Sequence, residues 1–309
     1  MALLPTNINY SGVDVNLLIQ EAFAETLLYK KFNARTVESV KSAYFFFDVT
    51  TGITLQAPEC CVSTFDDVTL HQRSGTICEF QGALSICYRD LIGTAREMKM
   101  RQGMNNENPL QDTDLITAIT ESTLADVANQ WDNIALNGDT TGGVGILGLC
   151  DGLLTKFKAD ATVIDVTAVP ANLTIAGVIG ELNKVVNAIP AALQYNPKYT
   201  VKIAVSLKIA RLYQQALASA QNIFIDITKS QALQYMGYEL VPLAYMPDNQ
   251  MFATYSDNII MVYDSESDIA NLSIYDKGAY SSCKEVEMVL NFRGAVDYGW
   301  GNQVVYYWN

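Results

Sequence analysis

One long helical pattern constrains the fold of this chain more than any other feature. Apolar side chains recur at the helical period over residues 112 to 136, while acidic side chains fall mainly elsewhere on the helical wheel. A helix of that length would extend for about 40 Å, enough to cross most of a domain. Asp112 or Thr113 is placed to cap its start after Pro109. Asn137-Gly138 is placed to end it, with the glycine in the left-handed conformation.

A glycine-rich segment, residues 137 to 149, follows this helix directly. Glycine-rich loops can bind phosphate, but this one lacks the Gly-Lys-Ser/Thr sequence and no helix is expected to open at its last glycine. We therefore expect the glycines to allow sharp turns after the long helix, and not to bind a nucleotide.

Before the helix, the sequence predicts an arm and an extended ribbon. Residues 1–43 carry a polar lead and one short helical pattern, which is too little to hold a core. Within residues 44–90, apolar patterns predict strands near Tyr44–Phe47 and at Phe80–Tyr88, joined by a long and mostly polar middle. A lone two-stranded ribbon is only marginally stable, so we expect it to lie against another surface.

The part of the chain after the glycine-rich segment mixes helices and strands, which is typical of a compact α/β unit. Helices are predicted at 175–189, before Pro190, and at 207–220, where Ser206 is placed as the N-cap. A turn is predicted at 298–301, so that the last two strands of the chain would form a pair. The predicted strands are 199–205, 238–243, 251–255, 259–263, 285–293 and 303–308.

Composition favours a protein that is covered by other copies of itself. Charged residues make up 17% of the chain, against about 25% in typical soluble domains, and hydrophobic residues make up 50%. Protein interfaces are depleted in charge and enriched in aromatic side chains and methionine, although a solitary low-charge protein would have the same composition. The net charge of −13 and the lack of a basic stripe argue against direct recognition of nucleic acid.

No motif for catalysis, a cofactor or a metal fits the sequence. The single histidine, His71, has no nucleophile motif beside it and is expected on a surface loop. The acidic run 264–268 resembles the start of a calcium loop, but Ile269 and Tyr275 stand where that motif requires glycine and glutamate. We expect solvated acids in a loop, with a weak divalent-ion site shared between subunits as the alternative.

Cysteine usage and hydropathy predict the compartment. The six cysteines lack the paired spacing of a zinc site or a thioredoxin-like redox centre, and we expect free, partly buried thiols in a reducing cytosol. No apolar stretch reaches the roughly 18 residues of a membrane span. The first residues lack the basic region of a signal peptide. The sequence thus predicts a protein made and kept inside a cell, without membrane contact.

The order of these parts resembles that of the major capsid proteins of tailed phages, which have the Hong Kong 97 fold. The segment Leu136–Gly142 is similar to the end of the family's long spine helix. Tyr235–Pro242 is similar to a loop, glycine and strand of its axial domain, and Phe292–Val296 to the last long strand of its peripheral domain. The resemblance covers nearly the whole chain and rests on the order and spacing of these motifs.

The resemblance implies an α+β fold of the Hong Kong 97 capsid type, in which an extended loop lies over the adjacent subunit. It divides the chain into an N-terminal arm (1–43), an extension loop or β-ribbon (44–90), a peripheral domain (91–150 and 269–309) with the spine helix at about 112–136, and an axial domain (151–268). Side chains on and near the loop would then contact other subunits: Tyr44, Phe45, Phe46, Phe47, Phe65, His71, Arg73 and Phe80.

By the same resemblance the protein is a structural shell protein and not an enzyme, without a cofactor. It would assemble with itself into hexamers and pentamers of an icosahedral phage head around double-stranded DNA, in the host bacterial cytoplasm. A portal protein and separate scaffolding or decoration proteins would be further partners, and packaged DNA would be contacted without sequence-specific binding. Some relatives join subunits by isopeptide bonds from an extension-loop lysine. No lysine lies between Lys41 and Lys99 here, so we expect no such crosslink.

Two alternatives remain at this stage. An encapsulin-like nanocompartment shell shares the fold but holds cargo enzymes, and neighbouring genes for a portal and terminase, or for a cargo enzyme, would separate the two. An α/β enzyme that uses its carboxylates, with or without a metal, belongs to a different class. A small monomer that turns over a substrate would favour the enzyme.

Overall fold

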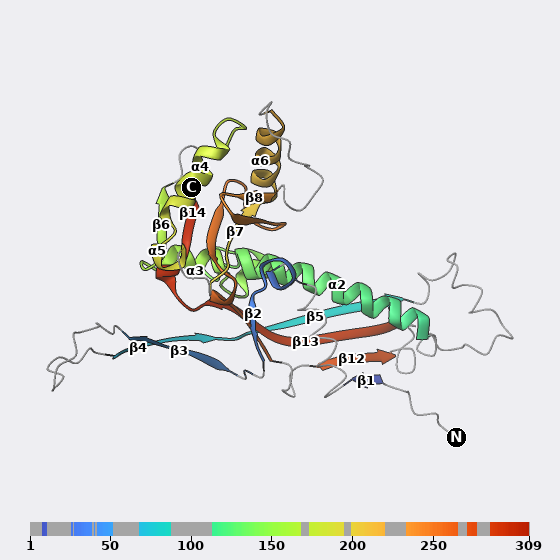
Figure 1. The fold of residues 1–309 in the computed structure, drawn as a ribbon. Helices are drawn as coiled ribbons and strands as arrows, with labels where there is room; N and C mark the ends of the chain where they lie inside the picture. The colour runs from blue at the N-terminus through green and yellow to red at the C-terminus, as the bar shows by residue number, and fades with distance from the viewer. Residues whose placement is uncertain are drawn as a thin grey trace, which may run out of the picture.

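The structure, a computed structural model, describes residues 8–10, 26, 28–38, 40, 42–51, 68–87, 113–167, 173–194, 199–219, 233–264, 271–276 and 285–308. Figure 1 shows a compact upper lobe, a long lower sheet with one long helix lying along it, and a two-stranded ribbon that extends away from their junction. The mixture of helices and sheets that the sequence predicts is confirmed.

The lower sheet is built around one long strand, β13. This strand pairs antiparallel with β12 and β5 along its first part and with β11 along its last part. The strands β1 and β2 extend the sheet beyond β12 and β11, respectively. The members are β1 (Ile8–Tyr10), β2 (Arg35–Val37), β5 (Cys78–Cys87), β11 (Ile259–Asp264), β12 (Asn271–Asp276) and β13 (Glu285–Tyr298).

The upper lobe contains a second six-stranded sheet with the order β6-β14-β10-β7-β9-β8. Helices α4 (Val178–Ala188) and α6 (Leu207–Ser219) pack with it around one buried apolar cluster. Every residue of β7 and β10 is buried, so the lobe has a core of its own. The strands are β6 (Ile164–Thr167), β7 (Val201–Ser206), β8 (Gln234–Tyr235), β9 (Tyr238–Leu243), β10 (Met251–Tyr255) and β14 (Val305–Trp308).

Local sequence signals place most elements of the upper lobe correctly. The strands predicted at 238–243 and 251–255 have these bounds. Pro190 lies just past the end of α4, where it was expected to stop the helix. Ser206 caps α6, because its Oγ accepts a hydrogen bond from the amide of Ile209 at 3.3 Å.

The predicted long helix is confirmed as α2 (Thr113–Asn137), within a residue of both expected ends. Its second half packs on the lower sheet through Trp131, whose ring contacts those of Phe80 and Phe292. Gly294 on β13 makes room for this ring, since a Cβ atom there would come within 2.6 Å of it. Aromatic packing therefore anchors the helix to the sheet.

Close backbone packing holds the end of α2, and not the left-handed glycine that we expected. Gly138 does not have a positive φ. Its amide donates to the carbonyl of Ile134 at 2.8 Å, and its own carbonyl accepts from the amide of Gly152 at 2.9 Å. A Cβ atom on Gly138 would lie 2.0 Å from the carbonyl oxygen of Cys150. Glycine is required here because two backbones approach closely, a contact that the local sequence does not reveal.

The glycine-rich segment forms turns, as expected, and leads through η5 (Gly145–Gly148) to α3 (Leu153–Ala159). The Oδ1 of Asp139 accepts hydrogen bonds from the amides of Thr141 at 2.9 Å and Gly142 at 3.0 Å. A carboxylate bound to these amides occupies the donors that a phosphate would need, which agrees with the turn interpretation.

Two strand pairings differ from the predicted ones. The ribbon consists of β3 (Ala43–Thr51) and β4 (Val68–Thr76), whereas β5, which was expected as its second strand, pairs with β13. The strands β13 and β14 do not form a hairpin, because β14 lies in the upper sheet between β6 and β10. Alternation of apolar residues marks a strand but does not name its partner, and the partner depends on tertiary contacts.

Two polar residues lie in strands and not in the loops expected for them. Asp264 ends β11, is fully buried, and stands opposite Arg293 of β13. His71 belongs to β4, opposite Asp48 of β3. The rest of the acidic run, and nearly all of the helix predicted in the arm, lie outside the described residues. The remaining short elements are η1 (Leu28–Phe32), α5 (Ala191–Gln194), η7 (Ser256–Asn258) and η9 (Gly301–Gln303).

Candidate functional site

One face of the β3–β4 ribbon packs against the body of the chain. Directly opposed residues of paired strands share a face, so Tyr44 lies beside Gly75, and Phe46 beside Arg73. Tyr44 is only 4% exposed. A Cβ atom on Gly75 would come within 2.1 Å of the Tyr44 hydroxyl, so the tyrosine ring lies over a position that only glycine leaves open. We call this side the buried face.

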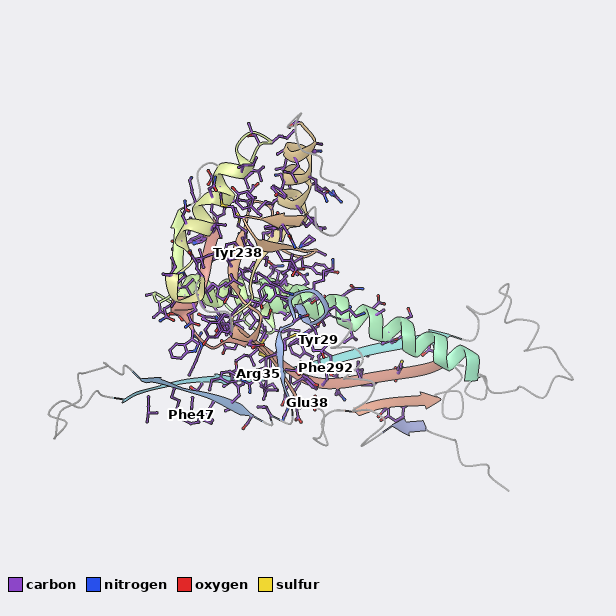
Figure 2. The ribbon with its side chains drawn as sticks, viewed as in Figure 1. Tyr29, Arg35, Glu38, Phe47, Tyr238 and Phe292 are labelled. Carbon is purple, nitrogen blue, oxygen red and sulfur yellow. A yellow bond between two sulfur atoms is a disulfide. The ribbon has the colours of Figure 1, made fainter. Side chains whose placement is uncertain are left out.

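The opposite side of the ribbon, the exposed face, presents apolar side chains to solvent. Phe45 is 55% exposed, and Phe47, which is labelled on the ribbon in Figure 2, is 71% exposed. Leu70 lies on the same side, because it pairs with Val49, two residues beyond Phe47, and it is 73% exposed. Large apolar side chains gathered on one side of a projecting ribbon are typical of a surface that another protein covers.

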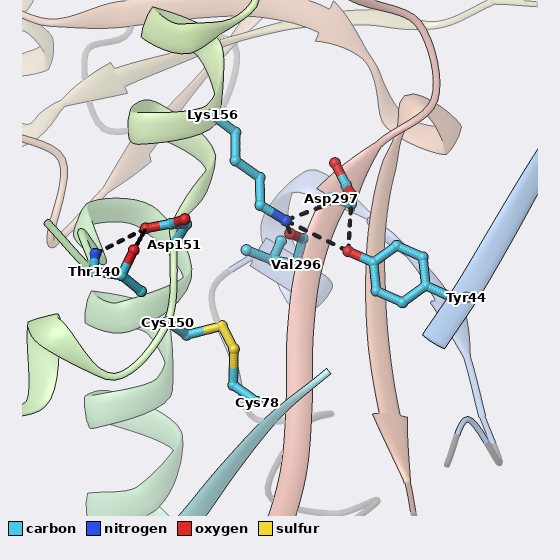
Figure 3. Close-up of a disulfide and its surroundings, with 8 residues drawn as sticks. All are labelled: Tyr44, Cys78, Thr140, Cys150, Asp151, Lys156, Val296 and Asp297. Carbon is cyan, nitrogen blue, oxygen red and sulfur yellow. Dashed lines mark hydrogen bonds and ion pairs between the residues drawn. A yellow bond between two sulfur atoms is a disulfide. The ribbon is translucent and has the colours of Figure 1, made fainter. Parts of the chain in front are cut away.

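A cluster of charged and hydroxyl groups holds the buried face to the body. The Tyr44 hydroxyl donates a hydrogen bond to Oδ2 of Asp297 at 2.8 Å. On the other side of the same carboxylate, Nε of Arg73 lies 3.3 Å from Oδ1. The Nζ of Lys156 lies 3.5 Å from Oδ2 and donates to the carbonyl of Val296 at 2.7 Å (Figure 3). One buried carboxylate therefore joins the ribbon to β13 and α3.

A second carboxylate extends this arrangement, which we call the root cluster (Tyr44, Arg73, Lys156, Asp160, Asp297 and Tyr298). The Nη1 of Arg73 donates to Oδ2 of Asp160 at 2.9 Å, and the Tyr298 hydroxyl donates to the same oxygen at 2.8 Å. The guanidinium of Arg73 also stacks 3.9 Å above the centre of the Tyr298 ring. Two cations thus meet two carboxylates at the base of the ribbon.

Burial and hydrogen bonding shift several pKa values in the root cluster. Burial, reinforced by the Asp297 carboxylate, raises the pKa of the Tyr44 hydroxyl far above its usual value, so this group stays a donor. Burial alone would raise the pKa of Asp160, but hydrogen bonds from Thr162 and from cluster members outweigh it and lower the pKa below its usual range. Burial lowers the pKa of Lys156, while Asp297 opposes that shift. The cluster is therefore suited to fixing geometry by charge pairing.

A disulfide lies beside the root cluster and corrects the expectation of free thiols for two of the six cysteines. Cys78 at the start of β5 is bonded to Cys150, with an S–S distance of 2.02 Å and a Cα–Cα distance of 5.9 Å (Figure 3). The two residues are 72 positions apart. Sequence spacing carried no sign of the pair, because only the fold brings β5 next to the segment after α2.

The described residues meet the requirements of neither a metal site with three or more ligands nor a membrane-spanning helix. No group of three or more His, Cys, Asp or Glu side chains in that part of the chain is placed to hold a metal ion. Nor does any described helix combine the length and hydropathy needed to cross a membrane. A groove of about 990 Å³ borders the ribbon, with Phe46, Tyr255 and Trp300 among its lining residues. The groove is lined by residues of the ribbon and of the body.

The structure divides the residues that were predicted to contact other subunits. Phe45 and Phe47 are exposed, and for them a contact with another subunit stays a prediction. Phe46 is partly buried. Tyr44 and Phe80 are buried in packing within the chain, against the root cluster and the Trp131 ring, respectively. Their described contacts are therefore internal ones.

The charged residues at the ribbon base were the part that sequence reasoning missed. Arg73 was singled out, and it pairs with Asp160 and Asp297 of its own chain. Neither acid was a candidate, because each is an ordinary carboxylate without a motif, and both lie far from Arg73 in the sequence. Phe65, and the side chain of His71, lie outside the described residues.

Comparison with known proteins finds matches by structure but none by sequence. No protein-family model and no curated protein matches this sequence. A chain of the satellite phage P4 procapsid including size determination (Sid) protein matches with a TM-score of 0.66 and 14% identity, over 97% of this chain and 91% of that chain. The capsid of Myoviridae phage XM1 matches with a TM-score of 0.56 and 12% identity, over 91% of both chains. This chain has a phage capsid fold.

The capsid fold is shared well beyond these two structures. Mycobacterium phage Adephagia gives a TM-score of 0.58 at 13% identity, over 91% of this chain and 89% of that chain. A virus-like particle from Pyrococcus furiosus matches with a TM-score of 0.52 at 6% identity, over 96% of this chain and 99% of that chain. The resemblance to phage capsid proteins inferred from the sequence is thereby confirmed for the backbone arrangement of nearly the whole chain.

Proposed function

We propose that this chain is the major capsid protein of a tailed phage, a structural subunit and not an enzyme. The observation that carries the proposal is the match to a phage procapsid chain over 97% of this chain and 91% of the other. Hexamers and pentamers of the subunit would form an icosahedral head around double-stranded DNA, assembled in the cytoplasm of the host bacterium. The arm, extension loop, peripheral domain and axial domain would then have the ranges given above, except that β5 and β11 belong to the lower sheet of the peripheral domain and β14 to the upper sheet of the axial domain.

The ribbon would supply the principal contact between neighbouring subunits. Its exposed face carries Phe45, Phe47 and Leu70, each more than half exposed. Burying apolar surface contributes about 25 cal/mol per Å², so three such side chains give a useful but modest contact. A closed symmetric shell repeats every such contact many times, and modest contacts are then sufficient.

The net charge of −13 argues against tight binding of DNA by the subunit, so the shell would confine the packaged DNA without binding it tightly. An acidic inner surface would repel phosphate and leave the genome free to move. A portal protein, and separate scaffolding or decoration proteins, would be the other partners.

An encapsulin-like compartment is the second candidate, and the match to the virus-like particle from Pyrococcus furiosus favours it. It would have the same subunit contacts but enclose a cargo enzyme. Copurification of a single cargo protein with empty shells would favour the compartment, whereas shells filled with DNA in infected or induced cells would favour the phage head.

Expression of the chain alone, followed by sedimentation and negative-stain electron microscopy, tests the proposal. We expect closed shells or ring-shaped oligomers with five- and six-fold views. On a denaturing, reducing gel the particles should give one band, since no lysine lies in the predicted extension loop to form an isopeptide ladder. A monomer that stays monomeric at high concentration, with or without co-expressed partners, would contradict the proposed function.

A further inference from the structure

The Cys78–Cys150 disulfide lies where the ribbon joins the body. The strand β4 ends at Thr76 and β5 begins at Cys78, so a single residue separates the bonded cysteine from the ribbon. That residue, Ile77, donates its amide to the carbonyl of Ser42 at 3.2 Å, immediately before β3. The bond therefore restrains the base of both ribbon strands at once.

The other end of the bond is attached to a tightly packed part of the body. Cys150 lies beside the close contact between Gly138 and Gly152, where backbone atoms leave no room for a side chain. The next residue, Asp151, accepts hydrogen bonds at 2.8 Å from both the amide and the hydroxyl of Thr140. A covalent bond to this segment leaves the ribbon little freedom to pivot.

Small molecules have a route to the sulfur atoms. Both cysteines line a cavity of about 760 Å³, together with Ser74, Thr76 and Asp151. Cys78 is partly exposed, whereas Cys150 is 4% exposed. The outer sulfur can therefore react first with a reagent from solution, and the buried one can complete the bond from within the protein.

We propose that this disulfide is a late modification of the subunit, formed when the assembled particle leaves the reducing cytosol, and that it locks the ribbon in its assembled position. The inference rests on the proposed function, because a chain made in a bacterial cytosol meets mainly reduced thiols. The oxidant would be a low-molecular-weight disulfide in the surrounding medium.

The reaction is an ordinary thiol–disulfide exchange in two steps. The Cys78 thiolate attacks one sulfur of the small disulfide, which forms a mixed disulfide and expels one small thiolate. The Cys150 thiolate then attacks the Cys78 sulfur and expels the second. The protein loses two electrons and two protons, and the small disulfide gains them as two thiols.

The root cluster can place the ribbon before the disulfide forms, so the position of the ribbon and its covalent locking are two separate steps. Tyr44 and Arg73 hold the ribbon through Asp297 without any covalent bond, so a reduced subunit can still assemble. The disulfide lies within one chain, so it stiffens every subunit without linking neighbours. Its effect should appear in ribbon mobility and heat resistance, and not as a ladder on a gel.

The test compares particles before and after oxidation of the two cysteines. Alkylation and mass spectrometry should find Cys78 and Cys150 reduced in freshly lysed cells that are quenched with alkylating agent, and bonded after incubation with oxidised glutathione. Bonded particles should show about tenfold slower hydrogen exchange in β3 and β4. They should also withstand heating by about 5 °C more than reduced particles.

Serine variants provide the controls. Cys78→Ser and Cys150→Ser should each behave like reduced particles whatever the redox state, whereas Cys87→Ser, at the far end of β5, should keep the full response. Equal ribbon exchange and equal heat resistance in the oxidised and reduced forms would overturn the proposal, as would a bond already complete in the quenched cells. Alkylation can be read on unassembled subunits, so a failure of assembly alone would count against the proposed function and not against the lock.

Discussion

The two faces of the ribbon follow opposite rules although they share the same nine-residue strands. On the buried face, Tyr44 and Arg73 find their partners inside the chain, where Asp297 accepts a hydrogen bond from Tyr44 and forms an ion pair with Arg73. On the exposed face, Phe45 and Phe47 remain more than half exposed. Contacts within the chain therefore fix how the ribbon is attached, while the exposed face is left open for the subunit contact proposed above.

The largest effect on stability should come from replacing Asp297, the carboxylate that both Tyr44 and Arg73 of the buried face contact. Asp297→Asn removes the charge that Arg73 and Lys156 share, and its side chain is only 4% exposed. We expect a loss of about 3 kcal/mol in the free energy of unfolding, at the lower end for a buried pair because both cations keep some solvent contact. Urea unfolding of the subunit measures this.

Asp257→Asn is the matched control for that variant, because Asp257 is an exposed acid on η7. Its cost should stay within about 0.5 kcal/mol. Equal costs for the two variants would mean that the buried face is not held by its charges.

The exposed face should behave in the opposite way. Phe45→Ser and Phe47→Ser should change the unfolding free energy of the isolated subunit by less than about 0.5 kcal/mol, because little packing within the chain is lost. Each should weaken a contact between copies by about 1.5 kcal/mol, and so raise the protein concentration needed for assembly about tenfold. Light scattering against concentration measures this.

Val144→Ser controls for loss of exposed apolar surface in general, since Val144 is 87% exposed and lies off the ribbon. It should assemble near the wild-type concentration. If the phenylalanine variants destabilise the subunit but assemble normally, the contrast between the two faces is broken.

Lowering the pH should produce the smallest effect on the unfolding free energy, through Asp160, which pairs with Arg73 at the buried face. The pKa of Asp160 is lowered in the folded state, so its stabilisation is present above the unfolded pKa and is lost as pH falls toward the folded one. The unfolding free energy of the wild type should exceed that of Asp160→Asn by about 1 kcal/mol or less near neutral pH, because the carboxyl is partly solvated. That margin should shrink below about pH 4. A margin that grows on acidification would mean that the folded chain does not favour the charged form of this carboxyl.

Local signals explain what the sequence could predict. The helix α2, the cap at Ser206 and the stop at Pro190 each depend on residues within a few positions of one another. The apolar run of Tyr44–Phe47 likewise predicts a strand, and alternation within it places Phe45 and Phe47 on one side. The exposed face of the ribbon was therefore within reach of the sequence alone.

The contacts of the buried face could not be predicted from the sequence, because its partners come from distant segments. Tyr44 and Asp297 are 253 positions apart, and Arg73 and Asp160 are 87 apart. The cysteines of the disulfide carry no mutual spacing signal for the same reason. A single sequence states which side chains are charged or aromatic, but the choice among many equivalent carboxylates is made only when the sheets pair.

The position of β14 has a consequence for how the subunit is made. This strand fills an interior place in the upper sheet, with β6 on one side and β10 on the other, yet it is formed by Val305–Trp308. While a ribosome is still adding those residues, the two neighbours face an open seam with unpaired backbone groups. The lobe can close only after they emerge, and during that interval crowded nascent chains can exchange their β14 strands with one another.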